Sequence, residues 1–199
     1  PFNFMGTSKL MGEQLIRAAN LTEPNTRFFS TRFGNVLGSR GSVIPIFRGQ
    51  IEAGVPVTLT SREMTRFVMT LDEAVSLIIE SMTLAVGGEV FVTKMKAIRV
   101  EELAEVMIED IRGVDVQGKS DSLISEVGVR PGEKLFEELM TDEEARRSLE
   151  SNNYYTIFPA LTDIYDRHDR FSKDESLGVS IPYNSSVVPP MTKEELREY

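Results

Sequence analysis

Apolar residues recur at steps of three and four in two stretches of the chain, residues 71–85 and 100–111, and this spacing predicts an amphipathic helix in each. The same steps separate Met5, Lys9, Gly12, Glu13 and Ile16, and residues 44–53 are a candidate short helix that Gly54-Val55-Pro56 would end. Helices are therefore expected over residues 5–19, 44–53, 71–85 and 100–111. The last two are expected to gather apolar side chains on one face. These side chains are Val75, Ile78, Ile79 and Met82 in the third helix, and Val100, Leu103, Met107 and Ile111, pointing inward, in the fourth.

Runs of β-branched and aromatic residues between the helices predict strands over 26–33, 57–60 and 89–93. Residues 152–190 show no regular pattern and are expected to be irregular. A hydroxyl residue three positions before a glutamate is typical of a helix start. It occurs at Thr70, Thr141 and Thr192. Because strands and helices alternate, the chain is predicted to be an α/β protein.

Composition excludes several classes of protein. With 22 Lys and Arg against 31 Asp and Glu, the formal charge is −9, which argues against nucleic-acid binding. The absence of cysteine suits a reducing cytoplasm, and no apolar run is long enough to predict a membrane segment. The chain starts at Pro1 without a methionine and enters directly into patterned sequence, so we interpret it as part of a longer polypeptide.

Two features are interpreted as carrying no site. Residues 113–120 fit the phosphate-loop pattern G-x-x-x-x-G-K-S, but such a loop needs a strand before its first glycine. Here a helix is expected to precede it, and Asp115 would repel a polyphosphate. His168 has no second histidine and no cysteine to complete a metal site, so no metal is predicted.

Three segments carry candidate chemistry. Residues 3–9 place Lys9 four positions after Met5 on one helix face, and residues 32–45 combine a strand end with small residues that a ligand can approach closely. The third combines residues 64–67 with residues 130–134, each with an arginine suited to a diphosphate or a ribose. Together these segments indicate an anionic, nucleotide-like ligand.

At these residues the chain resembles the C-terminal half of an extended short-chain dehydrogenase/reductase. The similarity is closer to nucleotide-sugar 4,6-dehydratases of polysaccharide biosynthesis, which act on UDP-N-acetylglucosamine. The similarity covers about residues 1–150. Three motifs carry it: residues 32–45, which begin with Arg-Phe-Gly-Asn-Val and end at Pro45, Met-Thr-Arg-Phe at 64–67, and Arg-Pro-Gly-Glu-Lys-Leu at 130–135. The tail around residues 183–186 resembles the capsule-type, C5-inverting members more loosely.

The resemblance implies a cofactor side of the site for NAD or NADP. Lys9 matches the lysine of the family's Y-x-x-x-K motif and would hold the nicotinamide ribose, and Gly34 would contact the nicotinamide. Met5 stands in the tyrosine position, where a thioether cannot transfer a proton. Proton transfer would then fall to residues upstream of this chain.

The resemblance also implies a substrate side for a UDP-sugar. Asn35 would reach the sugar diphosphate, Arg66 and Arg130 would clamp diphosphate and ribose, and Glu133 would accept a ribose hydroxyl. The remaining expected contacts are Ser42 and Val43 along the sugar nucleotide, and Thr58 and Leu59 near the uracil.

The implied architecture is a partial Rossmann sheet plus a sugar-nucleotide-binding lobe. Residues 1–40 would end the dinucleotide-binding domain, residues 41–150 would form the lobe with a strand over 89–93 returning to the sheet, and residues 151–199 would be an extension. The G-x-G-x-x-G fingerprint is absent from the chain and lies upstream in the family, so the chain alone is expected to be inactive.

The implied activity of the whole protein is that of a lyase in capsule or surface polysaccharide biosynthesis, acting as a homo-oligomer. Hydride leaves carbon 4 of the hexose and makes it a ketone. A proton from carbon 5 and the hydroxyl of carbon 6 are then lost as water, and hydride returns to carbon 6. Two alternatives stay open. One is a UDP-sugar 4-epimerase, which Met5 disfavours; the other is a non-catalytic module for UDP-sugar binding or assembly.

Overall fold

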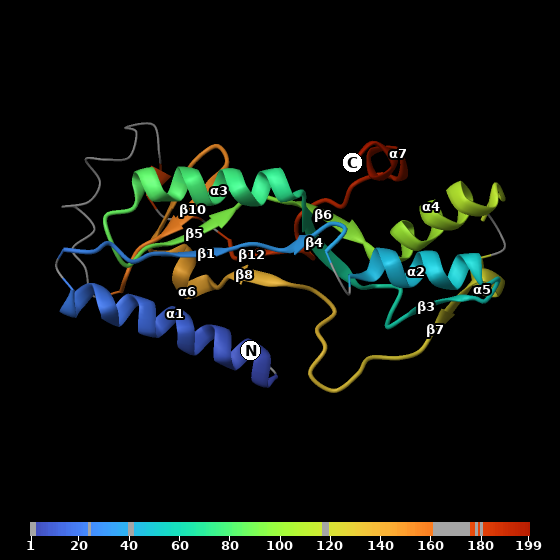
Figure 1. The fold of residues 1–199 in the computed structure, drawn as a ribbon, viewed down its shortest axis with the longest axis horizontal. Coiled ribbons are helices and arrows are strands. Elements are labelled where there is room, and N and C mark those ends of the chain that lie inside the picture. Colours follow the sequence, from blue (N-terminus) through green and yellow to red (C-terminus); the bar gives the residue numbers. More distant parts are fainter. Residues whose placement is uncertain are drawn as a thin grey trace. The chain divides into compact units, whose positions relative to one another are not determined.

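The computed structural model describes residues 3–23, 25–39, 42–116, 120–160, 176–177, 179 and 181–199. Their contacts form two compact units, each assembled from three separate stretches of the chain. The first unit contains Pro1–Phe33, Leu71–Lys94 and Glu138–Asn184, and the second contains Gly34–Thr70, Met95–Glu137 and Ser185–Tyr199. Figure 1 shows the ribbon of both units. The boundaries at residues 40 and 150 stay a prediction.

A five-stranded sheet organises the first unit, in the order β1-β5-β10-β9-β11. β1 and β5 pair in parallel, and the other pairs are antiparallel. The strands are β1 (Ser30–Arg32), β5 (Val90–Thr93), β10 (Tyr154–Ile157), β9 (Ser148–Glu150) and β11 (Ser176–Leu177). A separate pair joins β8 (Glu138–Met140) to β12 (Tyr183–Asn184). The helices are α1 (Phe4–Thr22), α3 (Leu71–Leu84) and the short α6 (Asp142–Ala145).

The core of the first unit is built around β5, whose first three residues are fully buried. Phe91 meets the rings of Phe29 and Tyr154 edge to face, with centroids 5.8 and 5.9 Å apart. Leu77 of α3 packs on the same cluster. A strand buried on both faces is typical of the parallel part of an α/β sheet.

Within its described residues, the second unit contains two smaller sheets and three helices of six or more residues. One sheet has the order β2-β4-β6, from β2 (Asn35–Val36), β4 (Thr65–Met69) and β6 (Lys96–Arg99), and the other pairs β3 (Val57–Leu59) with β7 (Ile124–Glu126). The helices are α2 (Val43–Glu52), α4 (Val100–Arg112), α7 (Lys193–Glu198) and the single turn α5 (Ser120–Leu123). α2 and α4 pack on β3 through a cluster that includes Phe47, Leu59 and Ile108.

The sequence patterns locate the helices well. The mixed α/β class is confirmed, as are helices at all four expected places, α1, α2, α3 and α4. Thr141 and Thr192 form complete capping boxes with Glu144 and Glu195. Among the residues expected to point inward from α4, Val100 and Leu103 are buried. Ile111, near the end of the helix, is exposed.

The expected strand over residues 26–33 is wrong in its length, because β1 begins only at Ser30. The side chain of Asn20 occupies both backbone groups of Phe28: its amide nitrogen donates to the Phe28 carbonyl at 2.7 Å and its oxygen accepts from the Phe28 N–H at 2.9 Å. Pairing with the neighbouring strand therefore starts later, where the Ser30 N–H bonds the Glu89 carbonyl.

The segment 152–190 contains more order than expected, because β10 and β12 lie in it. Residues 161–175, with His168 among them, lie outside the described residues. The phosphate-loop pattern begins at Gly113, which follows α4 with a φ of 65° and closes that helix as a left-handed cap. A helix therefore precedes this glycine, and residues 117–119 are also outside the described ranges.

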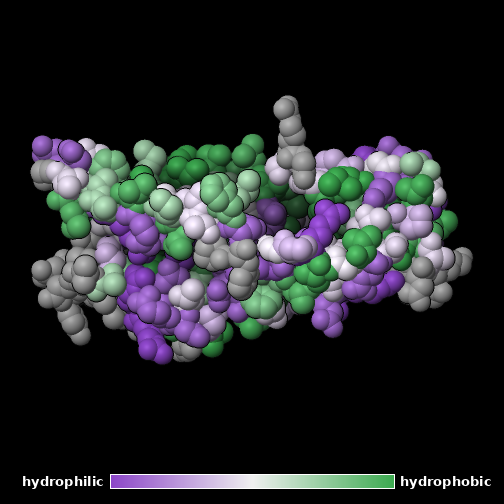
Figure 2. All heavy atoms as spheres, turned by 90° about the horizontal axis from the view of Figure 1, so that it is seen from below, coloured by the Kyte–Doolittle hydropathy of each residue, from purple (hydrophilic) through white to green (hydrophobic). Residues whose placement is uncertain are grey.

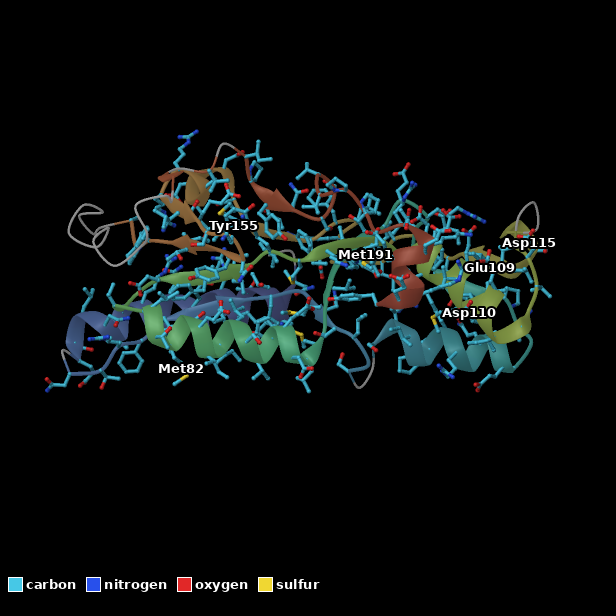
Figure 3. The ribbon with its side chains drawn as sticks, turned by 90° about the horizontal axis from the view of Figure 1, so that it is seen from above. Met82, Glu109, Asp110, Asp115, Tyr155 and Met191 are labelled. Carbon is cyan, nitrogen blue, oxygen red and sulfur yellow. The ribbon has the colours of Figure 1, made fainter. Side chains whose placement is uncertain are left out.

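The apolar face of α3 is exposed, although its residues do share one side of the helix. Val75, Ile78, Ile79 and Met82 are 41–65% exposed, whereas the smaller Ala74 and Ser81 are buried with Leu77. Figure 3 shows Met82 pointing away from the helix into open space. Apolar side chains also appear on the surface as green spheres in Figure 2. Within the described ranges, no helix combines the length and the apolarity needed to cross a membrane.

Candidate functional site

A cavity of about 360 Å³ lies in the second unit. Its walls come from β2, α2, β3, β4, β6 and α4, with an apolar side that includes Phe47, Leu59, Val68 and Leu103. A cavity of this size, apolar with a few polar groups, is typical of sites for small organic ligands. The cavity is therefore the candidate site of this unit.

Most residues assigned to the substrate side line this cavity. They are Asn35, Ser42, Val43, Thr58, Leu59, Arg66 and Glu133. Arg130 is not part of the lining: its side chain is exposed, and its carbonyl accepts a hydrogen bond from the Glu133 N–H at 3.0 Å. The structure thus brings three separate motifs together at one cavity and leaves one of the two expected arginine side chains outside it.

The guanidinium of Arg66 is anchored by backbone carbonyls. Its bonds run to the oxygens of Thr65, Leu135 and Lys134, at 2.7, 3.2 and 2.8 Å. Burial lowers the pKa of Arg66 below its usual value, while the charges of Glu137 and Glu133 oppose this change. Arg66 Nε also forms an ion pair with Glu137 Oε1, at 4.0 Å. Since a guanidinium carries five N–H groups, these contacts leave one Nη2–H to offer to a ligand.

A glutamate that the sequence motifs did not single out organises the polar edge of the cavity. Glu137 Oε2 accepts a hydrogen bond from the Phe67 N–H at 2.9 Å, and both of its carboxylate oxygens accept from Asn35 Nδ2 at 3.0 and 3.1 Å. The same Nδ2 donates to the Phe67 carbonyl at 3.0 Å. Two side chains thus satisfy the backbone groups of a strand residue.

Gly34 is required by packing within the second unit. A Cβ at this position would lie 2.6 Å from Phe67 Cβ and 2.7 Å from the Phe67 carbonyl oxygen. Its N–H donates to the sulfur of Met95 at 3.0 Å. The close approach of Phe67 therefore explains this glycine without a ligand, and the expected contact with nicotinamide stays a prediction.

Two further polar groups of the cavity differ in their bonding. Glu133 accepts a hydrogen bond from the Thr60 hydroxyl at 3.0 Å, which orients its carboxylate. Ser42 precedes α2 as its N-cap, yet its buried hydroxyl makes no capping bond and has no hydrogen-bond partner among the residues that the structure describes. A buried hydroxyl without a partner beside the positive end of a ten-residue helix is suited to an anionic ligand group.

The two residues assigned to the cofactor side belong to α1 in the first unit. Asn3 caps this helix by accepting a hydrogen bond from the Gly6 N–H at 2.8 Å. Lys9 is exposed, and among the described residues its ammonium has no hydrogen bond or ion pair. Met5 is 69% exposed on the same helix.

A buried ion network fixes the helix that carries Lys9. Arg32, at the end of β1, forms paired hydrogen bonds with Glu13, one turn after Lys9, at 2.7 and 2.8 Å, and with Glu144 at 2.7 and 2.9 Å. Its fifth N–H donates to the Leu139 carbonyl at 2.8 Å. All donors of this guanidinium are used, so the network links α1, β1, β8 and α6.

Sequence reasoning missed Glu137 and Thr60, which bond the assigned residues Asn35 and Glu133. It also missed Glu13, which bonds Arg32 from the helix that carries Lys9. Asn35 and Glu137 are 102 positions apart, and Arg32 and Glu144 are 112 positions apart. No local periodicity connects such pairs. The nearest available signal was the position of Glu137 shortly after the Arg-Pro-Gly-Glu-Lys-Leu motif.

The chain belongs to the family of polysaccharide biosynthesis proteins, whose family model matches residues 1–159. It is 40% identical to the capsular polysaccharide biosynthesis protein CapD of Staphylococcus aureus, over 90% of this chain and 31% of that protein. It is 32% identical to an inverting UDP-N-acetylglucosamine 4,6-dehydratase of Campylobacter jejuni, over 98% of this chain and 58% of that protein. A UDP-glucose 4-epimerase of Rickettsia massiliae is 39% identical, over the whole chain and 57% of the relative. The chain thus spans between about a third and three fifths of these relatives.

Solved structures show the same fold. The X-ray structure of Pen from Bacillus thuringiensis superposes with a TM-score of 0.82 at 39% identity, and covers all of this chain with 56% of its own. DesIV, a dTDP-glucose 4,6-dehydratase from Streptomyces venezuelae solved with NAD and TYD bound, matches 65% of this chain with 39% of its own, at a TM-score of 0.54 and 20% identity. The expected short-chain dehydrogenase-like α/β fold is confirmed by this likeness.

Proposed function

We propose that this chain is the substrate-binding, C-terminal part of a UDP-N-acetylglucosamine 4,6-dehydratase, of the C5-inverting type, in surface polysaccharide biosynthesis. One observation carries the proposal: Asn35, Arg66 and Glu133, from three motifs far apart in the sequence, line one cavity. The Campylobacter relative supplies the substrate and the reaction, since its name states both.

The chemistry of the cavity supports a sugar nucleotide. The Nη2–H left on Arg66 suits a diphosphate, as does the hydroxyl of Ser42, which has no partner among the described residues. The carboxylate of Glu133 suits the hydroxyls of a ribose. Leu59 and Phe47 provide an apolar wall for a base. Arg130 is proposed to complete the clamp from the exposed turn before Glu133.

A nicotinamide cofactor, NAD or NADP, would supply a reversible acceptor for the hydride of carbon 4. Lys9 has the right donor chemistry for ribose hydroxyls, because its ammonium is exposed and forms no bond within the described residues. Met5 cannot exchange a proton in the hydride step. The proton transfers are therefore assigned to residues outside this chain, and the chain by itself is expected to be inactive.

A UDP-sugar 4-epimerase is the second candidate, favoured by the identity of 39% to the Rickettsia relative. Met5 argues against it, because an epimerase has to handle the same hydroxyl proton twice at carbon 4. Product analysis of the complete parent protein with UDP-N-acetylglucosamine separates the two functions. A 4-keto-6-deoxy sugar is expected as the product. A C4 epimer as the main product would contradict the dehydratase proposal and support the epimerase.

Calorimetry on the 199-residue chain tests the proposed site directly. UDP and UDP-N-acetylglucosamine are expected to bind, and Glu133→Gln is expected to weaken both about tenfold by removing a charged acceptor from a ribose hydroxyl. Glu126→Gln, an exposed carboxylate on β7, is the matched control and should leave both affinities unchanged. Absence of UDP binding by a folded sample would contradict the proposal.

The proposal also covers the localisation and the oligomeric state of the whole protein, which we propose to be a cytoplasmic homo-oligomer. The cysteine-free composition is compatible with a reducing compartment. Sedimentation velocity of the complete parent is expected to show a species larger than the monomer, and a monomer at micromolar concentration would contradict this part.

A further inference from the structure

Residues 190–199, here named the C-terminal strap, pack on the second unit, in which the candidate cavity lies. Pro190 forms a parallel bridge with Ala97 of β6, and the Met191 N–H donates to the Ala97 carbonyl at 2.8 Å. The strap thus extends the sheet β2-β4-β6 at its β6 edge and then continues into α7. Figure 3 labels Met191 just before this helix.

The side chain of Met191 supports one wall of the cavity from outside. It is 4% exposed and belongs to the same apolar cluster as Val68, Ile98 and Leu103. These three residues line the cavity, whereas none of the strap residues does, and residues 190–199 are all described. Close-packed side chains shift when a neighbour is removed, so the shape of this wall depends on Met191.

The charged face of the strap is tied to α4 by four ion pairs. Lys193 Nζ lies 2.9 Å from Glu105 Oε2 and 3.1 Å from Glu109 Oε1. Arg197 pairs with Glu109 and, at 3.3 Å, with Asp110. Ion pairs near the surface are individually weak, and a helix as short as α7 depends on such contacts for its stability. The strap can therefore leave the surface while the rest of the unit stays folded.

We propose that the C-terminal strap holds one wall of the ligand cavity in its binding shape, with Met191 as the positioning residue, so that strap docking and ligand binding stabilise each other. Undocking removes the support behind Val68 and Leu103, and the wall relaxes outward. A ligand that binds the docked form more tightly favours docking by the same factor, because linkage is reciprocal. This inference deepens the proposed function and rests on it for the identity of the ligand.

Docking is tested without any ligand, by hydrogen exchange of the Met191 N–H followed by ¹H–¹⁵N NMR. The double variant Lys193→Gln/Arg197→Gln removes the four ion pairs and is expected to speed this exchange about tenfold. Arg99→Gln is the matched control. Arg99 pairs with Glu102 of the same helix α4 at 3.1 Å but lies outside the strap, so its loss should leave the exchange unchanged.

The positioning role is tested by calorimetry with UDP. Met191→Ala is expected to weaken UDP about fivefold, whereas Met191→Leu, which keeps the volume, should stay within about twofold of the unmodified chain. Met140→Ala makes the same truncation at a fully buried methionine of the first unit and is the matched control. It is expected to lower stability but to leave UDP affinity within about twofold.

Reciprocity is tested on the unmodified chain, which decides the question if Met191→Ala does not fold. Saturating UDP is expected to slow exchange of the Met191 N–H about fivefold, although the strap does not line the cavity. The Phe158 N–H of the first unit, bonded to the Arg147 carbonyl at 3.0 Å, serves as the internal reference. A general gain in stability would slow both amides alike.

Four results would overturn the inference: full UDP affinity in Met191→Ala, an equal loss in Met140→Ala, equal slowing of both amides by UDP, or a Met191 exchange rate that ignores the loss of the ion pairs. Failure of the unmodified chain to bind UDP would overturn the proposed function and with it the coupling to the ligand. Exchange without ligand decides docking independently, so the two failures are distinguishable.

Discussion

Removing the charge of Glu144 should destabilise the first unit and abolish part of its acid sensitivity. Burial alone would raise the pKa of this carboxyl, but the hydrogen bonds and charge of Arg32, together with the bonds from Thr141, outweigh burial and bring the pKa to about 2, from an ordinary value of 4.5. A depression of about 2.5 pH units corresponds to about 3 kcal/mol of stability. Because the folded pKa is the lower one, this stability is present above about pH 4.5 and is lost as the pH falls through 2.

Urea unfolding followed by far-UV circular dichroism measures this contribution, since the chain has no tryptophan to report by fluorescence. At pH 7, Glu144→Gln is expected to cost about 3 kcal/mol, because Arg32 loses one of its two carboxylate partners. Between pH 5 and 2 the unfolding free energy of the unmodified chain should fall by about 3 kcal/mol more than that of the variant, until the two proteins are equally stable.

Glu143→Gln is the matched control. This neighbouring carboxylate bonds Arg147 at 2.8 Å but is 66% exposed, so its loss should cost less than about 1 kcal/mol. A cost below about 1 kcal/mol for Glu144→Gln at pH 7, or an acid dependence equal to that of the unmodified chain, would refute the reasoning.

Two further predictions concern single positions. Gly34→Ala should lower the free energy of unfolding by about 1–3 kcal/mol, because its Cβ would lie 2.6 Å from Phe67 Cβ. Gly12→Ala, whose Cβ would meet open space inside α1, should be neutral or stabilising by up to about 1 kcal/mol. The midpoints of urea unfolding measure both effects. In the complete parent enzyme, Lys9→Ala should abolish turnover, whereas Met5→Leu should keep most of it because Met5 transfers no proton. Near-normal rates for the lysine variant would contradict the role of Lys9 in binding the cofactor.

Local patterns predicted the helices because helix starts and periodic faces are encoded within a few residues. The capping box at Thr141 and the inward Leu103 of α4 are examples. Periodicity states which side chains share a face but not what covers that face, so the exposure of Ile79 on α3 could not be predicted. The five residues of β4 form a strand chiefly through partners distant in the sequence, and their local pattern was too short to mark it.

The candidate site was predictable in part for the same reason. Motif resemblance selected Asn35, Arg66 and Glu133, and the fold gathers them at one cavity. Resemblance did not predict that carbonyl groups occupy much of the Arg66 guanidinium or that Glu137 engages Asn35. These bonds depend on the three-dimensional arrangement of segments that are separated by 68 and 102 positions.

The interleaved composition of the two units limits how the polypeptide can be divided. The chain passes from one unit to the other at the junctions after residues 33, 70, 94, 137 and 184, so no single cleavage releases either unit as one continuous piece. Neither unit can be finished during synthesis before nearly all of the chain has left the ribosome, because each recruits a segment beyond residue 137. Shortening the polypeptide from its N-terminus removes first the residues of the first unit up to Phe33, and shortening it from its C-terminus removes first those of the second unit back to Ser185. Neither truncation isolates an intact unit, so substitutions within a unit are the better way to study it by itself.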